Sequence, residues 1–467
     1  MKEKSISESF LIPPRKPREY AEYSKFANED SRHQTSKFLY DFFSLFLFYF
    51  VFCFAEDPFK TNFESSLVLR QRLAYSYSEY VTHTVLHRIS TIQWLPDLYQ
   101  DDQTQYHQFL FGTNDYDSEE YYYDKNYLYV FGFAVSKDQF NGEIDKCRIH
   151  KFEMKGFAPF KLPTVLKKIF VRDPIKLARY MPQKSNFIAT IGYNSNQINI
   201  FDTNKHSRIS KNVKNKVKSN ILLGTNSVLK HFDWNSMTYG TIMGGSNDGI
   251  ISIWDINSKK IQSDKETKPV QTFQAFSDGN EVANCFFHPF SDNVAVVSSL
   301  NGDFSFFDFR IPNETSTSAI HTFKPHSSTL STISLSFFHQ HLFATGSSDN
   351  NVKLWDLRHM KRDIHTFQFH DSVTQIQFSP HCPHMLATAT TDPSIIILNC
   401  NKMGRVQPLD HNIQDGYAEV QFIHFQRQKI VDFSWGPPEH PWRFASADNS
   451  IAFNLWAPSL KSVYENI

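Results

Sequence analysis

The chain has 467 residues, enough for one large repeat domain or for two or three ordinary domains. Lys plus Arg and Asp plus Glu both number 48, so the chain carries no net formal charge and no global field that would attract nucleic acid. The five cysteines have no CxxC spacing, which argues against a disulfide framework and a zinc site and favours the cytosol or nucleus; they are Cys53, Cys147, Cys285, Cys382 and Cys400.

The N-terminal tail, residues 1–37, is polar and contains Pro13, Pro14 and Pro17. This composition predicts disorder. The basic cluster Arg15-Lys16-Pro17-Arg18 allows an alternative interpretation as a nuclear import signal, although four residues are weak evidence.

Residues 38–56 are anomalous because 38–55 read FLYDFFSLFLFYFVFCFA. A membrane helix needs about 20 apolar residues, whereas this run contains Asp41 and is not followed by a signal-peptide cleavage site. Phe, Leu, Ser, Tyr, Val and Cys can all be written with thymine-rich codons, and Ala55-Glu56 can be encoded as GCAGAG, which resembles an intron end. A translated intron, a membrane anchor and a buried or interface segment all remain open. An uninterrupted reading frame in the mature transcript would exclude the first.

Residues 57–80 are predicted to hold an N-terminal helix. Phe63, Leu67 and Leu73 recur at helical spacing, and residues 62–80 contain no Gly or Pro. From Val81 the pattern changes to strands, and residues 91–95, 108–112 and 127–135 are typical of a first β-blade.

Two loops are strongly charged. Residues 115–124 are acidic and aromatic, and residues 204–220 carry six Lys or Arg without an acidic residue. Both are interpreted as solvated loops. The alternatives are a contact for a basic partner at the first and non-specific phosphate binding at the second.

Similar strand endings recur along the chain: Phe201-Asp202, Trp254-Asp255, Phe307-Asp308, Trp355-Asp356, Leu398-Asn399 and Leu455-Trp456. Their first spacings, about 53, 53, 48 and 43 residues, match WD-type propeller blades. Each blade is a four-stranded sheet that cannot bury both faces alone, so several must stack in a ring. This predicts an all-β propeller over residues 81–460. Regular blades are expected at 228–257, 282–310, 330–358, 373–400 and 430–457, with a loop at 403–421.

Polar residues are expected to brace the blades, because a buried His between a carboxylate and an indole has its hydrogen bonds satisfied. The predicted bracing residues are His326, Asp349, Trp355, His370, Asp392 and Trp254. Leu398 replaces the tryptophan in the sixth blade. These histidines lack a nucleophilic partner, and the chain has no phosphate-binding glycine loop, nucleophile elbow or HExxH motif. Neither an enzyme activity nor a cofactor or metal is therefore expected.

Five stretches are more specific than a generic propeller pattern. They are Thr82-His83 through Gln93-Trp94-Leu95-Pro96-Asp97, Ala178-Arg179-Tyr180-Met181-Pro182-Gln183, Ala344-Thr345-Gly346-Ser347, Gln377-Phe378-Ser379-Pro380-His381 and Asp432-Phe433-Ser434-Trp435. The chain thereby resembles the histone-binding WD-repeat family, the retinoblastoma-binding and chromatin-assembly small-subunit family. The resemblance covers about residues 62–460, including the leading helix that generic propellers lack.

The resemblance implies a seven-bladed propeller with the N-terminal helix packed on its side. An N-terminal strand would complete the last blade and leave no open sheet edge. Family members hold histones within chromatin assembly, deacetylase, remodelling and Polycomb-type complexes and have no catalysis of their own. We therefore expect a nuclear, non-enzymatic chromatin scaffold without sequence-specific nucleic-acid binding. The alternatives are a diverged WD adaptor that no longer binds histones and a membrane-anchored propeller.

The family binds a histone helix in a side groove between the N-terminal helix and the loop before the last blade. Asp415, Gly416, Phe422 and Ile423 match the family loop, and Val68 and Leu69 fall at apolar helix positions that face the groove. The helix would bury its apolar side on Phe422 and Ile423 while Asp415 pairs with a basic residue. Two family prolines are missing, at Tyr417 and Ala418. Alternatively, Phe422 and Ile423 are core strand residues.

The family also binds a histone tail on an acidic axial face. Its acidic positions fall here on Leu86, Pro174, Val228, Ala283, Thr329 and Ser372, and its Trp-Pro pair becomes His87-Arg88. A cationic tail needs carboxylates to offset its lost hydration. We therefore expect this second site to be altered or lost.

Overall fold

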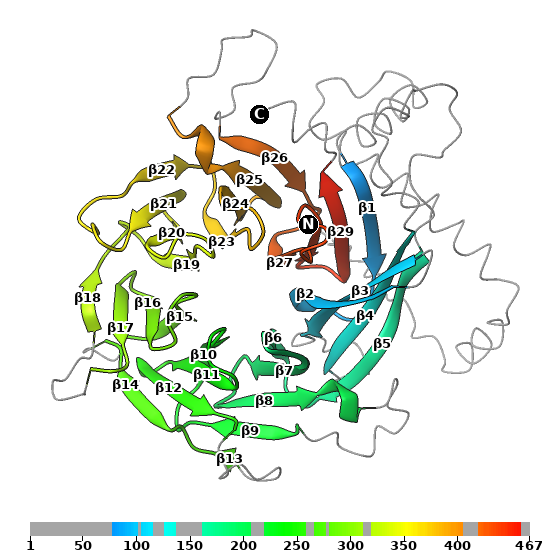
Figure 1. The fold of residues 1–467 in the computed structure, drawn as a ribbon, viewed down its shortest axis with the longest axis horizontal. Helices are drawn as coiled ribbons and strands as arrows, with labels where there is room; N and C mark the ends of the chain where they lie inside the picture. Colours follow the sequence, from blue (N-terminus) through cyan, green and yellow to red (C-terminus); the bar gives the residue numbers. More distant parts are fainter. Residues whose placement is uncertain are drawn as a thin grey trace, which may run out of the picture. The chain divides into compact units, whose positions relative to one another are not determined.

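The computed structural model describes residues 77–100, 104–114, 126–136, 161–206, 219–257, 266–276, 280–311, 319–404 and 419–458. All of them belong to one compact unit, Leu73–Ile467. They form seven β-sheets arranged as blades around a ring (Figure 1), which confirms the predicted seven-bladed propeller. The predicted tail, the apolar segment 38–56 and helix residues 57–76 lie outside these ranges. Within them, no helix is long and apolar enough to cross a membrane.

The strands of each blade follow one another from the centre of the ring outward. Blade 1 contains β2 (Ile89–Gln100), β3 (Thr104–Thr113), β4 (Asn126–Ser136) and β5 (Lys161–Val171). Blade 2 contains β6 (Ile175–Met181), β7 (Lys184–Gly192), β8 (Gln197–Asp202) and β9 (Ile221–Gly224). Blade 3 contains β10 (Leu229–Trp234), β11 (Thr241–Ser246), β12 (Ile250–Asp255) and β14 (Gln271–Gln274). Blade 4 contains β15 (Val282–Phe287), β16 (Val294–Ser299), β17 (Phe304–Asp308) and β18 (Ala319–Phe323).

Blade 5 contains β19 (Leu330–Leu335), β20 (Leu342–Ser347), β21 (Asn351–Asp356) and β22 (His365–Gln368). Blade 6 contains β23 (Val373–Phe378), β24 (Met385–Thr390), β25 (Ser394–Asn399) and β26 (Val420–Phe425). Blade 7 contains β27 (Ile430–Trp435), β28 (Phe444–Asp448), β29 (Ala452–Pro458) and β1 (Tyr77–Thr84). Single 3-10 turns, η4 (Thr203–Lys205) and η5 (Cys400–Lys402), follow β8 and β25. The five blades predicted from residue 228 onward are confirmed, each with a further outer strand.

The hydrophobic core is divided into seven clusters, each lying between two neighbouring blades. Both faces of an inner strand are therefore buried, and such strands read as continuous apolar runs rather than as alternating ones. In β16 all six residues are buried, and in β24 as well. This is the packing that stacked blades require.

Two glycines allow neighbouring blades to approach closely. A Cβ atom on Gly245 would lie 2.3 Å from Val282, and one on Gly346 would lie 2.6 Å from Val373. Both valines begin the next innermost strand. Any larger residue at either glycine would push adjacent blades apart.

The ring is closed by its two ends, as predicted. β1 pairs antiparallel with β29 over the whole length of β1. Residues 77–80 therefore belong to a strand, and the predicted helix cannot extend to Tyr80. The reason is tertiary: Tyr77 and Tyr80 pack on the core between blades 6 and 7, and that packing overrides a helical pattern of residues.

One short strand that follows blade 3 in the chain pairs with blade 2, which was not predicted. β13 (Glu266–Thr267) follows β12 of blade 3 in the chain, but it pairs in parallel with β9 at the outer edge of blade 2. The Trp254 indole N–H of β12 donates to the Thr267 carbonyl at 3.2 Å. The two blades are thus joined at their outer edges as well as through their shared core.

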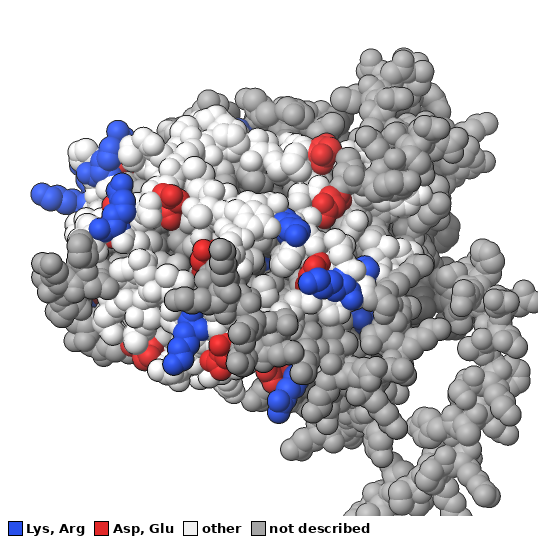
Figure 2. Space-filling view, turned by 60° about the horizontal axis from the view of Figure 1, so that its bottom comes forward, with Lys and Arg blue, Asp and Glu red and all other residues white. Residues whose placement is uncertain are grey.

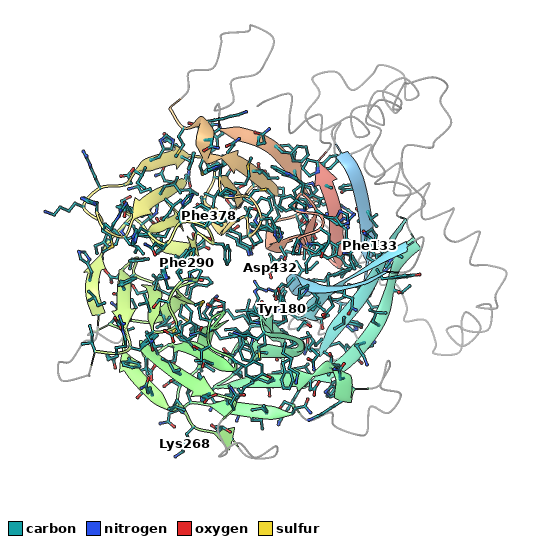
Figure 3. All side chains as sticks on the ribbon, viewed as in Figure 1. Phe133, Tyr180, Lys268, Phe290, Phe378 and Asp432 are labelled. Carbon is teal, nitrogen blue, oxygen red and sulfur yellow. The ribbon has the colours of Figure 1, made fainter. Side chains whose placement is uncertain are left out.

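The innermost strands of four blades meet at the carboxylate of Asp432 on β27, near the centre of the ring (Figure 3). On the side of blade 1, the Thr91 hydroxyl and the Ile92 N–H donate to Oδ2 at 2.8 and 2.9 Å. The Arg179 guanidinium of blade 2 donates to both carboxylate oxygens at 3.0 and 3.2 Å. From blade 6, Gln375 Nε2 donates to Oδ1 at 2.8 Å. Asp432 is buried, so this network holds the closing blade against three others.

Candidate functional site

The predicted bracing set of blade 5 is assembled. His326 Nδ1 lies 3.1 Å from both carboxylate oxygens of Asp349. His326 Nε2 lies 2.8 Å from the Thr345 hydroxyl oxygen, which also accepts the Trp355 indole N–H at 2.9 Å. Burial lowers the pKa of His326 against the opposing effect of Asp349. The chain of contacts joins two strands, β20 and β21, to the two loops that carry His326 and Asp349. Thr345, its central member, was not among the predicted residues.

The predicted set of blade 6 is not assembled. His370 and Asp392 are exposed, and no hydrogen bond joins their side chains in the described structure. Thr388 occupies the position in blade 6 that Thr345 occupies in blade 5. Each threonine is paired across the sheet with the residue two positions before Leu398 or Trp355, respectively. Because Leu398 has no N–H to donate, the buried Thr388 hydroxyl is left without a hydrogen-bond partner. The blade is held by apolar packing instead.

Trp254 and blade 7 show two further variants of bracing. Gly244 stands where blade 5 has Thr345, so the Trp254 indole bonds to a backbone carbonyl, as described above. In blade 7 the Trp456 indole donates to the Ser446 hydroxyl at 3.0 Å, and Gln426 Nε2 reaches the same oxygen. Glutamine thus takes the place of histidine, which concealed this set from sequence analysis.

A matched pair of substitutions tests the bracing. Thr345→Val should lower the free energy of unfolding by about 1–3 kcal/mol, because His326 and Trp355 each lose a buried partner. Thr388→Val should change it little or raise it, because the hydroxyl removed has no partner. Chemical denaturation of both variants measures the difference, and equal losses would contradict the assignment.

The side-groove residues are only partly described. Val68, Leu69, Asp415 and Gly416 lie outside the described ranges. Phe422 and Ile423 lie on β26, the outermost strand of blade 6. Phe422 is only 9% exposed, whereas Ile423 is 41% and Phe425 is 54% exposed. The two groove residues on this strand therefore differ, since Phe422 faces the core and Ile423 faces outward.

An aromatic cluster joins β26 to the ring closure. The Tyr77 ring lies 5.2 Å from Phe422, and its hydroxyl is 3.0 Å from His424 Nδ1. The His424 ring stacks on Trp456 at 4.0 Å. These contacts hold Tyr77, the first residue of β1, beside β26.

The buried imidazole of His424 predicts a pH effect. Burial lowers the pKa of His424 to about 3, against about 6.5 in the unfolded chain. The stabilisation that this neutral histidine provides is therefore complete above about pH 6.5 and is lost as the pH falls toward 3. Relative to His424→Leu, the wild-type free energy of unfolding should fall by about 2 kcal/mol between pH 7 and pH 5. Denaturation at both pH values measures this, with the exposed His370→Leu as control; parallel profiles for wild type and His424→Leu would contradict it.

The six positions at which the family has acidic residues lie at one axial end of the ring. Pro174, Val228, Thr329 and Ser372 directly precede innermost strands. Leu86 lies three residues before β2, and Ala283 is the second residue of β15. The side chains at this end include an 89% exposed Leu86 and the hydroxyls of Thr329 and Ser348, whose oxygens are 2.7 Å apart. Glu281 also lies near this end, but its carboxylate is already paired with the Lys230 ammonium at 3.1 Å.

The described residues include surface charges of both signs (Figure 2) and three thiols with raised pKa values. Figure 2 shows Lys and Arg interspersed with Asp and Glu over the face in view. Burial raises the pKa of the Cys285, Cys382 and Cys400 thiols, which keeps them protonated and poorly nucleophilic. No group of three metal-ligating side chains occurs within the described ranges.

Two similarities to known proteins agree with this geometry. Residues 317–356 and 361–399 match the family described as WD domain, G-beta repeat. The chain is also similar to the RbAp48-related WD40 repeat-containing protein prw1 of Schizosaccharomyces pombe strain 972. The two are 27% identical over 297 residues, which is 62% of this chain and 66% of the relative. The chain is a diverged WD-repeat propeller related to the RbAp48-like proteins. It spans just under two thirds of that relative's length.

The matched repeats of this RbAp48-like propeller are offset from its blades by one strand. Residues 317–356 run from β18 of blade 4 through β21 of blade 5. Each repeat therefore starts with the outer strand of one blade and continues with three strands of the next. The last blade consequently lacks an outer strand until β1 supplies it.

Proposed function

We propose that this protein is a non-enzymatic, nuclear scaffold of chromatin complexes that binds a histone helix at its side, next to β26. The fold and the relationship to the RbAp48-like proteins support a scaffold role. The observation that carries the side site is the pair of exposed apolar residues, Ile423 and Phe425, on β26, the strand whose Phe422 contacts Tyr77 at the start of β1.

The proposed groove has β26 as its floor, with the segment before Tyr77 and the segment before Val420 as its walls. An amphipathic histone helix would lay its apolar side on Ile423 and Phe425. Phe422 would support the floor from beneath, because it packs on Trp456 at 5.9 Å. Val68, Leu69, Asp415 and Gly416 remain the proposed wall residues.

Titration of the full-length protein with a histone-helix peptide tests the proposal. Ile423→Asp and Phe425→Asp should each weaken binding by about 2 kcal/mol if these residues are anchors, which is about thirtyfold in Kd. Ile320→Asp is a matched control, because Ile320 is exposed on β18, the outer strand of blade 4. Phe422→Ala is not a suitable probe, since it would open a cavity between blades 6 and 7.

Unchanged helix affinity in both β26 variants, or an equal loss in Ile320→Asp, would reject the side groove and favour the adaptor without histone binding. A histone-tail peptide provides the second arm of the experiment. We expect no specific tail binding, because the axial positions carry no carboxylates. Tail binding that survives an increase in salt would contradict this.

A further inference from the structure

The axial end opposite the Leu86 positions carries a group of exposed apolar side chains. They lie in the loops that join the first and second strands of blades 3, 4 and 5, residues 235–240, 288–293 and 336–341. Their exposed fractions are 59% for Met237, 45% for Tyr239, 42% for Phe290, 50% for Phe337 and 44% for Phe338. We call these three loops the aromatic face. Monomeric proteins rarely expose large apolar patches unless the patch binds a partner.

The three loops adjoin one another. Asn235 Nδ2 of blade 3 donates to the Asp292 carbonyl of blade 4 at 2.8 Å. His288 Nε2 of blade 4 lies 2.8 Å from the Gln340 carbonyl oxygen of blade 5. Phe290 lies toward the inner side of the ring (Figure 3). The loops that carry these exposed apolar side chains therefore adjoin one another across three blades.

The loops are also held in shape while their apolar side chains face solvent. Asn235 Oδ1 accepts the backbone N–H groups of Met237 and Thr238, both at 2.9 Å. Ser336 Oγ accepts those of Phe338 and His339 at 3.2 and 3.1 Å. A surface that is ordered before binding loses little conformational entropy when a partner docks.

The charge beside the aromatic face indicates the kind of partner. Leu357 N–H donates to the His341 carbonyl at 2.8 Å, so segment 356–364 of blade 5, which is the end of β21 and the loop after it, adjoins the face. This segment holds Arg358, Lys361 and Arg362 against two carboxylates, Asp356 and Asp363. Asp356 is paired with Arg358 and Asp363 accepts the Thr366 hydroxyl. Lys361 and Arg362 are both exposed, which gives the blade 5 side of the rim an excess of positive charge. On the blade 4 side, the carboxylate of Asp292 accepts the Asn293 side-chain amide at 2.5 Å.

We propose that the aromatic face binds an acidic peptide segment. Its aliphatic or aromatic side chains pack on Phe290, Phe337 and Phe338, and its carboxylates pair with Lys361 and Arg362. Aromatic anchors inside a charged rim are the arrangement that concentrates binding energy in a few residues. This site is separate from the histone groove, and its ligand has the opposite charge to a histone.

A display library of random short peptides, selected on the full-length protein, tests the proposal. Enriched peptides should combine Phe, Leu, Ile or Trp with Asp or Glu. Their Kd should rise at least about tenfold for Phe337→Ser/Phe338→Ser and also rise for Lys361→Glu/Arg362→Glu. Leu86→Ser removes an exposed apolar side chain from the opposite axial end and should leave Kd unchanged.

The proposal is overturned if no peptide is enriched, if enriched peptides lack acidic residues, or if they bind the Phe337→Ser/Phe338→Ser variant as tightly as the wild type. Sedimentation of the protein alone tests a competing occupant. A concentration-dependent dimer that this variant abolishes would assign the face to a second copy of the chain and would also overturn the proposal.

Discussion

Asp432→Ala should lower the free energy of unfolding by about 3–5 kcal/mol, because it leaves the Arg179 guanidinium without its buried partner. Thr91 and Gln375 lose a hydrogen-bond acceptor in the same step. Urea denaturation, followed by tryptophan fluorescence, measures the loss. Since four blades meet at this carboxylate, we expect the whole ring to become less stable rather than blade 7 alone.

Two further variants make this prediction specific. Asp356→Ala breaks an exposed carboxylate pair with Arg358 and should have a much smaller effect. Asp432→Ala/Arg179→Met removes the stranded charge and should recover part of the lost stability. Additive losses in the double variant would show that Asp432 acts through something other than its pairing with Arg179.

Trp456→Ala should have the second large effect, a loss of about 3–5 kcal/mol. Trp456 is completely buried and lies between His424 and Phe444, whose ring centroids are 4.0 and 4.3 Å away. The substitution would open a cavity where blade 6, blade 7 and β1 meet, and the Ser446 hydroxyl would lose its indole donor. Thermal or urea unfolding measures the loss.

Trp442→Ala is the matched control for that cavity. Trp442 is only partly buried and packs at the edge of the same cluster, with its ring 6.5 Å from Trp435. Its truncation should destabilise the protein less than that of Trp456. A ranking in the reverse order would mean that the aromatic stack contributes little to ring closure.

The fold could be predicted because blade endings repeat. Each blade is a local unit, so its last inner strand can be recognised from residues such as Trp254 or Trp355 in the local sequence alone. The bracing was readable only in blade 5, where His326 and Asp349 keep the usual residue types. In blade 6 both predicted partners point to solvent, and in blade 7 Gln426 carries the role without a recognisable signal.

The contacts across the ring could not be read from the sequence. Asp432 stands in a stretch that resembles the histone-binding family, but its role depends on Thr91, 341 residues away in the chain. The same holds for the direction of Phe422 and Ile423, because β26 is the outer strand of its blade and its two faces have different surroundings. Phe337-Phe338 stand between turn-forming residues in the sequence, yet only the structure shows that their loop adjoins the loop of Phe290.

Ring closure also has a consequence for how the protein is made. The Thr82 hydroxyl donates to Asn454 Oδ1 at 2.7 Å across 372 residues of chain, so β1, the first of the described strands, is among the last to find its partner. Until β29 has been translated, blade 7 is incomplete and the edge of β1 is unpaired. That edge can then pair with other nascent chains. A premature stop codon before β29 would make that state permanent. The codons for β29 therefore determine whether the preceding blades become a closed ring.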